Sequence, residues 1–319
     1  MKSSFFAAAL AATVLFSQGA ASEVLPTDCS TDYVGGTAPD LVNAKLKNGL
    51  RELCFSEFAV YHSGLTATPL FVAQHLTADI VHRAKAVDRV NVFHAEPRLP
   101  SSERAELSHY ARSGFDRGHM AAAADMATTK GQDESFSLAN MVPQKPSLNR
   151  KDWAKIEDTT RDIAERYGEV YVVTGPVFSG ASLSRIGGRV LVPTYVYKAV
   201  YVPSTGQSSA WWADNKTGGM EVVTIDQLTD RVGADVFPAV PASSKAALVK
   251  LPLPLGAPPI TVAADTDTDV TAAIPQEQTK AKVNGGGHAA AAKPESWWDW
   301  VLAVLVAVLE IVVRIVWRS

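Results

Sequence analysis

The stretch Ser113-Gly114-Phe115-Asp116-Arg117-Gly118-His119-Met120 holds the densest group of chemically capable side chains in this chain of 319 residues. Gly118 predicts a tight backbone turn beside a ligand, because glycine adopts conformations that other residues avoid. His119 carries the side chain whose ordinary pKa best suits proton removal from water near neutral pH. Arg117 offers a planar cation suited to phosphate oxygens. A string this short also arises by chance, and it would then be only a turn with a hydrogen-bonded histidine.

A second informative stretch runs from Asn140 to Glu157, with the sequence NMVPQKPSLNRKDWAKIE. Pro143 and Pro146 predict extended backbone there, since a residue that precedes proline avoids the helical region. A helical pattern follows from Ser147 to Tyr167 and stops at Gly168.

Four residues recur at intervals of four along this predicted helix: Asn149, Trp153, Glu157 and Arg161. They form a slowly drifting stripe that carries an amide, a carboxylate and a guanidinium, which is unusual for a core face. The alternative is an exposed Glu157–Arg161 pair, worth about 0.3–0.5 kcal/mol and without a chemical role.

At these two stretches the chain resembles the DNA/RNA non-specific endonucleases, the ββα-metal nucleases that include the Serratia nuclease and mitochondrial endonuclease G. The resemblance covers roughly Glu52 to Ala213. Several separate motifs carry it in the family's order: Phe115–Met120, Asn140–Gln144, Leu148-Asn149, Trp153, Glu157, Tyr171–Phe178 and Val192–Lys198.

The resemblance implies a role for each matching residue. His119 corresponds to the general base that acts on the attacking water, and Asn149 to the direct protein ligand of the metal. Glu157 corresponds to the carboxylate that holds metal-bound water, and Arg117 to an arginine near the scissile phosphate. Arg161 falls where the family often has another phosphate-stabilising arginine.

A further arginine is expected upstream of the first motif, and both Arg89 and Arg104 are candidates for it. Two departures from the family pattern, Phe93 and Ala121-Ala122, leave the catalytic residues intact.

The implied reaction is hydrolysis of phosphodiester bonds in DNA and RNA, with 5′-phosphate products and weak sequence preference. The cofactor is expected to be Mg²⁺, with Mn²⁺ as a substitute, because an amide oxygen is a hard ligand that leaves most of the water shell in place. A nuclease fold that binds without cutting is the alternative, and the intact His119, Asn149 and Glu157 argue against it. A formal net charge of −3 excludes bulk basicity as evidence for a nucleic-acid partner.

Residues 23–237 read as one α+β domain with the ββα-metal nuclease fold and a central, mainly antiparallel sheet. The β-branched run Val170–Thr174 predicts a buried strand, and Tyr195–Val202 with Ser208–Ala213 predicts a hairpin. Ser101–Tyr110 predicts a short helix capped by Ser102.

Residues 1–22 have the pattern of a signal peptide, with Lys2, an apolar run from Phe5 to Phe16 and small residues before Glu23. A buried N-terminal helix is the alternative. Export to the periplasm or the extracellular space permits a disulfide between Cys29 and Cys54, the two cysteines of the chain. Two buried thiols remain the other interpretation.

The C-terminal part predicts a flexible Pro/Ala-rich linker at 238–296 and a hydrophobic helix at 297–319. Trp297–Trp317 is long enough to span a bilayer, although Glu310 and Arg314 interrupt it. We expect a membrane anchor; an interfacial or self-associating helix, a soluble docking helix, and a membrane-permeabilising segment with the nuclease as cargo are the alternatives. A homodimer is a further open possibility, common among relatives but without a pattern in these residues.

Overall fold

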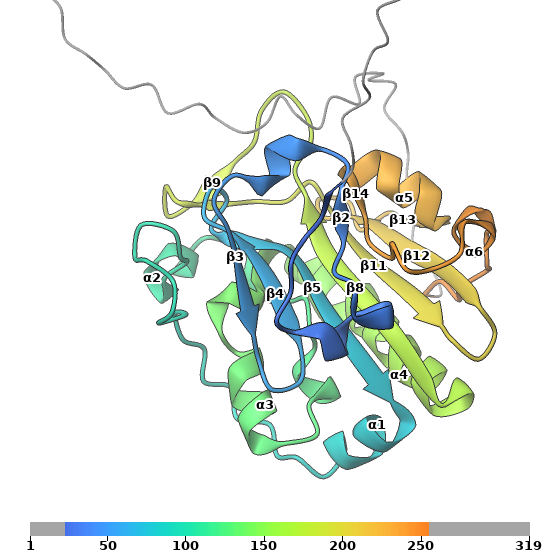
Figure 1. Ribbon diagram of the computed structural model, residues 1–319. Helices are drawn as coiled ribbons and strands as arrows, with labels where there is room; N and C mark the ends of the chain where they lie inside the picture. The colour runs from blue at the N-terminus through green and yellow to red at the C-terminus, as the bar shows by residue number, and fades with distance from the viewer. Residues whose placement is uncertain (1–22, 255–319) are drawn as a thin grey trace, which may run out of the picture. The chain divides into compact units, whose positions relative to one another are not determined.

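The structure is a computed structural model that describes residues 23–254 (Figure 1). The predicted signal peptide at 1–22, the predicted hydrophobic helix at 297–319 and most of the predicted linker lie outside these residues. Within residues 23–254, none of the helices combines the length and the apolar character that a membrane crossing requires.

A seven-stranded sheet with antiparallel neighbours throughout forms the centre of the domain (Figure 1). The prediction of an α+β domain with a central antiparallel sheet is therefore confirmed. In spatial order the strands are β13 (Met220–Val223), β12 (Gln207–Asp214), β11 (Tyr195–Val202), β8 (Glu169–Val177), β5 (Thr68–Thr77), β4 (Ala59–Ser63) and β3 (Leu50–Cys54).

Three smaller sheets surround the central one. Their strands are β1 (Glu23–Val24), β2 (Asp40–Leu41) and β14 (Ala234–Asp235); β9 (Arg185–Ile186) and β10 (Val190–Leu191); and β6 (Asp116–His119) and β7 (Met141–Gln144). The helices are α1 (Ala78–Ala84), α2 (Leu107–Tyr110), α3 (Thr129–Ser135), α4 (Ala154–Tyr167), α5 (Ile225–Val232) and α6 (Ala242–Ala246).

Both faces of the central sheet are covered, and alternating side chains enter two separate cores. Trp211 lies in the core that includes Trp153 and Ile156 of the α4 region. Its neighbour Trp212 lies in the opposite core, with Leu228 of α5. The sheet is therefore buried on both sides, and the motifs around His119 and Asn149 lie on the face that carries α4.

The N-terminal segment (blue in Figure 1) crosses the face opposite α4 and is linked to the sheet by a disulfide. Cys29 and Cys54 form this bond, with their Cα atoms 5.4 Å apart, as predicted. Glu52 lies close to both sulfur atoms, but the disulfide removes the thiolates that a metal would need.

Two predicted element boundaries differ from the structure. The expected helix over Ser101–Tyr110 is reduced to α2, because residues before Leu107 form turns whose groups bond elsewhere. Arg51, for example, donates to Glu103 at 2.8 Å. Packed chain also continues past Phe237, since Trp211 Nε1 donates to the carbonyl oxygen of Pro252 at 2.9 Å.

Candidate active site

The two sequence motifs, Phe115–Met120 and Asn140–Glu157, form a strand–strand–helix unit beside the central sheet. Strand β6 pairs antiparallel with β7, so that Asp116 lies opposite Gln144 and His119 opposite Met141. The chain then enters a π-helical segment, Leu148–Trp153, that continues directly into α4. Helical segments with this wider turn are frequent at functional sites.

Gly118 lies in the middle of β6, and the predicted tight turn at this residue is wrong. Its importance is instead the close approach of β7. A Cβ atom at this position would lie 2.1 Å from Gln144 Oε1 and 2.7 Å from Gln144 Cβ. Only glycine leaves room for the glutamine side chain across the hairpin.

A pocket of about 420 Å³ opens beside this hairpin. It brings together His119 and Arg117 from β6 with Asn149 from the π-helical segment, three of the five residues to which the sequence assigned roles. The remaining lining comes from α2 and the loops on either side of it, from the start of β6 and from the π-helical segment, and consists of Arg89, Phe93, Leu107, Tyr110, Ala111, Phe115, Asp116 and Arg150.

The imidazole of His119 is held between aromatic rings. The ring of Phe136 meets it edge-on at a centroid distance of 5.1 Å, and the ring of Phe93 lies at 5.8 Å. Burial, together with the nearby cations Arg89 and Arg117, lowers the pKa of His119 to about 3. The side chain is therefore neutral near physiological pH, and its buried Nε2 has no hydrogen-bond partner among the described residues.

Arg117 lies above the ring of Phe93, with its Cζ 4.0 Å from the centroid. This contact fixes the guanidinium at the pocket wall, close to His119, through a cation–π interaction. Arg117 contacts a ring face and forms no ion pair with a carboxylate among residues 23–254. Its positive charge is therefore available to the pocket.

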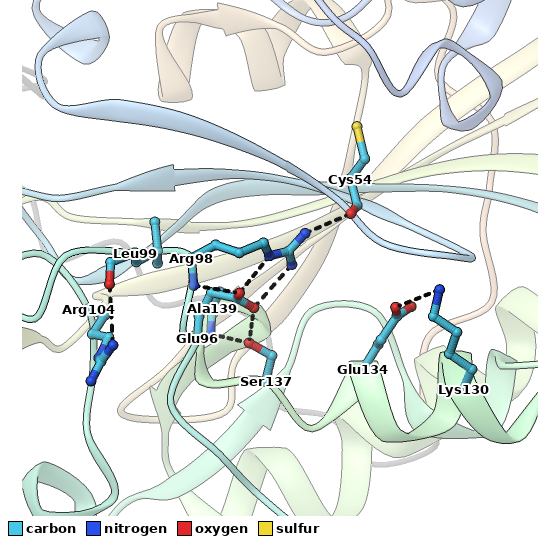
Figure 2. Close-up of polar contacts among 9 residues, drawn as sticks. All are labelled: Cys54, Glu96, Arg98, Leu99, Arg104, Lys130, Glu134, Ser137 and Ala139. Atoms are coloured by element: carbon cyan, nitrogen blue, oxygen red, sulfur yellow. Dashed lines mark hydrogen bonds and ion pairs between the residues drawn. The ribbon is translucent and has the colours of Figure 1, made fainter.

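Of the two candidate upstream arginines, Arg89 lines the pocket. Its Nε donates to Asn91 Oδ1 at 2.8 Å, and its Cζ lies 5.5 Å from the Phe136 ring centroid. Arg104 bonds elsewhere: Figure 2 shows its guanidinium donating to the carbonyl oxygen of Leu99, at 3.3 Å.

The segment between these arginines is fixed by a buried carboxylate (Figure 2). Glu96 is 2% exposed and accepts hydrogen bonds from Arg98 Nε at 2.6 Å and from Ser137 Oγ at 2.9 Å. Arg98 in turn donates to the carbonyl oxygen of Cys54 at 2.9 Å. These bonds tie the loop that carries Phe93 to β3 and to the turn before β7.

Asn149 is oriented by a carboxylate on β6. Its Nδ2 donates to Asp116 Oδ2 at 3.0 Å, and Arg150 Nε donates to the same oxygen at 2.8 Å. The Arg150 hydrogen bonds, supported by that from Asn149, lower the pKa of Asp116, which stays ionised. Because an ionised carboxylate only accepts, the amide nitrogen must face Asp116, and Asn149 Oδ1 is left for another partner.

Glu157 and Arg161 lie further along α4, outside the set of residues that line the pocket. The pKa of Glu157 is raised to about 7, mainly by burial and to a smaller extent by Asp125, against the lowering effects of Lys198, Arg161 and Arg89. Arg161 Nη1 donates to Asp125 Oδ1 at 2.7 Å, and its Nη2 donates to Asp158. The structure therefore pairs Arg161 with two carboxylates.

Comparison with known proteins decides what kind of molecule this is. Residues 39–243, more than half of the chain, match the sequence profile of the DNA/RNA non-specific endonuclease family.

This chain belongs to the DNA/RNA non-specific endonuclease family.

Curated relatives agree with the family assignment. Nuclease C1 of Cunninghamella echinulata var. echinulata is 39% identical over 155 residues, which cover 45% of this chain and 62% of that protein. The mitochondrial nuclease of Saccharomyces cerevisiae is 31% identical over 223 residues, which cover 61% of this chain and 68% of that protein. The match to the first relative thus leaves more than a third of its length outside the alignment.

Among solved structures, a chain of the EndoG/EndoGI complex superimposes with a TM-score of 0.55 at 28% sequence identity. The match covers 59% of this chain and 87% of that chain. The fold of this family member is therefore shared with a solved relative over most of the relative's length.

The sequence assigned no role to Lys198, whose charge interacts with those of Glu157 and Asp125. Lys198 is 1% exposed, and its Nζ donates to Thr174 Oγ1 at 2.9 Å and to the carbonyl oxygen of Met120 at 3.3 Å. Burial lowers its pKa, while Glu157 and Asp125 favour the charged form. A lysine inside the apolar run of β11 was the signal available in the sequence.

The donor set fits a hard divalent cation. Asn149 Oδ1 is free because the amide nitrogen is bound to Asp116, and no hydrogen bond reaches the Glu157 carboxylate from residues 23–254. The pKa of Glu157 is raised mainly by burial, although Lys198, Arg161 and Arg89 favour its charged form, so the carboxylate is poorly solvated. Oxygen ligands of this kind suit Mg²⁺ or Mn²⁺ better than zinc.

Proposed function

We propose that this chain is a Mg²⁺-dependent endonuclease that hydrolyses the phosphodiester bonds of DNA and RNA and leaves 5′-phosphate products. The observation that carries the proposal is the pocket in which His119, Arg117 and Asn149 lie together. It contains a neutral base, a fixed cation and a free amide oxygen, the three groups that such a hydrolysis needs.

His119 acts as the general base. Its low pKa keeps the imidazole neutral, so that a ring nitrogen can accept a proton from the attacking water. The rings of Phe93 and Phe136 hold the imidazole in one orientation. General base catalysis of this kind contributes about 10²–10⁴-fold in rate.

Arg117 and Arg89 bind the oxygens of the scissile phosphate from the pocket wall. Their charge also stabilises the additional negative charge of the transition state. The sequence assigned the same role to Arg161. Arg161 instead forms ion pairs with Asp125 and Asp158, which supports a positioning role: it would hold α4, the helix that also carries Glu157.

Asn149 supplies the direct protein ligand for Mg²⁺, and Glu157 supplies a nearby carboxylate. When bound, the cation would polarise a phosphate oxygen and stabilise the charge on the departing oxygen, and Mn²⁺ is proposed as a substitute. Contacts to phosphate carry no base information, so both DNA and RNA are expected substrates with weak sequence preference.

Incubation of the purified chain with plasmid DNA and with RNA tests this proposal. Both substrates should be degraded with Mg²⁺ and remain intact with EDTA. His119→Ala should lower the rate by about 10²-fold or more, whereas His82→Ala, a change at an exposed histidine of α1, should not. Full activity of the His119→Ala protein would contradict the mechanism.

We also propose export through residues 1–22 to the periplasm or the extracellular space, and membrane attachment through 297–319. The disulfide between Cys29 and Cys54 supports an oxidising compartment. Fractionation of the full chain and of a chain without residues 297–319 separates these cases, and an unchanged distribution would reject the anchor. Light scattering of the same samples tests the possible homodimer.

A further inference from the structure

A second pocket of about 350 Å³ adjoins the candidate active site. Phe115 lines both pockets and therefore connects them. The walls of the second pocket come from three loops and from the end of β7, and are formed by Lys145, Ser182, Leu183, Ser184, Val192, Pro193, Thr194, Asp214, Asn215 and Lys216.

The charge and chemistry of this second pocket suit a polyanion. Lys145 Nζ lies 4.3 Å from the centroid of the Phe115 ring, and Lys216 is exposed at the rim. Neither lysine forms an ion pair with a carboxylate of residues 23–254. Asp214 is the acidic residue of the lining, and its Oδ1 already accepts from the backbone N–H groups of Lys216 and Thr217, at 2.7 and 2.8 Å.

The second pocket is held rigidly against the first by a buried amide. Asn215 is 2% exposed and uses its side chain for three hydrogen bonds. Its Oδ1 accepts from Lys145 N at 3.0 Å, and its Nδ2 donates to the carbonyl oxygens of Pro143 and Pro193, at 3.0 and 2.9 Å. These bonds join the end of β7 to the loops that build the far walls.

Lys145 connects this arrangement to the catalytic residues. Its carbonyl oxygen accepts from the backbone N–H of Asn149 at 2.9 Å, at the start of the π-helical segment. Its side chain therefore projects from the same short stretch that carries the proposed metal ligand. Phe115 and, against its ring, Lys145 thus adjoin the pocket that holds His119 and Asn149.

We propose that the second pocket binds the nucleotide next to the scissile phosphate, with Lys145 and Lys216 on backbone phosphate and Phe115 against a sugar or base. The proposal rests on the proposed function, because it assigns the path of the same substrate. Basic side chains that alternate with an aromatic ring are the usual means of holding one strand without reading its sequence.

Binding without cleavage tests this path independently of catalysis. The probe is a fluorescent single-stranded oligonucleotide of about twenty nucleotides, titrated by anisotropy in EDTA at several salt concentrations. Loss of two phosphate contacts in Lys145→Gln/Lys216→Gln should reduce the slope of log affinity against log salt by about 1.4. Lys145→Arg/Lys216→Arg, which keeps both charges, should retain the wild-type slope.

Lys45→Gln/Lys250→Gln is the matched control, because it removes the same charge from exposed lysines outside both pockets. The control should keep the wild-type slope. An unchanged slope in Lys145→Gln/Lys216→Gln, or an equal reduction in the control, would overturn the proposal. A wild-type chain that shows the predicted binding but does not cut with Mg²⁺ would instead contradict the proposed function.

Discussion

Asn149 Nδ2 donates a hydrogen bond to Asp116 Oδ2 at 3.0 Å, and this bond connects the first strand of the catalytic hairpin to the helix that follows it. The acceptor-only carboxylate decides which end of the amide faces the pocket. In the proposed mechanism Asp116 would therefore act on the metal through Asn149. Hydrogen bonds from Arg150 lower the pKa of Asp116 and keep its carboxylate ionised.

Asp116→Ala should therefore weaken Mg²⁺ binding, although Asp116 is not itself a proposed ligand. Loss of such a supporting hydrogen bond typically costs about 10–100-fold in metal affinity. The Mg²⁺ concentration that gives half-maximal cleavage should rise by that factor. Asp152→Ala, which removes a carboxylate from the same π-helical segment, is the control and should leave the Mg²⁺ requirement unchanged. An unchanged requirement in Asp116→Ala would show that Asn149 is positioned by other contacts.

Mg²⁺ binding should strengthen as the pH rises through 7. Burial raises the pKa of Glu157 to about 7, so the metal-free protein holds a proton there at lower pH that the cation must displace. Calorimetric titration with Mg²⁺ at about pH 6 and pH 8 measures the difference. Glu157→Gln should remove this pH dependence, and a Glu157→Gln protein with the wild-type dependence would exclude Glu157 as its source.

Gly118→Ala should damage the hairpin. The new Cβ atom would lie 2.1 Å from Gln144 Oε1, so β6 and β7 must separate or the glutamine must move. Overpacking of this kind costs about 1–3 kcal/mol in the free energy of unfolding, and cleavage should fall because His119 follows Gly118 directly.

Gln144→Ala provides the matched second change. The Gln144 amide has no hydrogen-bond partner among the described residues, so its removal breaks no such bond. In the Gly118→Ala background it should restore part of the thermal stability. Equal melting temperatures for Gly118→Ala and the wild type would show that the hairpin tolerates a methyl group.

Asp32→Asn should stabilise the protein in alkaline but not in acidic solution. Burial, and then repulsion from Glu52, raises the pKa of Asp32 from 3.8 to about 7. The folded chain thus binds an extra proton between these values, and stability falls as the pH rises through that window. The substitution should raise the free energy of unfolding by on the order of 1–2 kcal/mol at about pH 8 and should leave it unchanged at about pH 3. This gain is smaller than the full pKa shift implies, because the Asp32 side chain is partly in contact with solvent.

Thermal unfolding at both pH values measures this effect. Asp133→Asn, at an exposed carboxylate of α3, is the control and should show no such difference between the two conditions. A stabilisation by Asp32→Asn that is the same at both pH values would rule out the proposed ionisation.

The sequence predicted the parts of the fold that are determined by residues close together in the chain. The hairpin of β11 and β12, the strand β8 and the helix that ends at Gly168 all have strong periodicity and clear turn residues. The helix predicted over Ser101–Tyr110 is shorter than expected and begins at Leu107, because contacts with distant residues such as Arg51 hold the first half of the range in turns. Such contacts leave no periodic signal in the sequence.

The sequence predicted those residues of the candidate site that belong to recognisable motifs, but not the residues outside the motifs. His119, Arg117 and Asn149 come together in one pocket, but the sequence could not choose between Arg89 and Arg104. The intervening loop has little regular structure, so its path depends on the buried Glu96 and its partners. Gly118 was misinterpreted because the need for glycine comes from Gln144, across the hairpin.

A single diffraction measurement tests the central claim most directly. Crystals soaked in Mn²⁺ give an anomalous signal at the cation, and the peak should lie in the pocket beside Asn149 Oδ1, on the side that His119 faces. Absence of a peak there in crystals that still bind Mn²⁺, for example with density beside Glu52 instead, would contradict the shared site of His119 and Asn149.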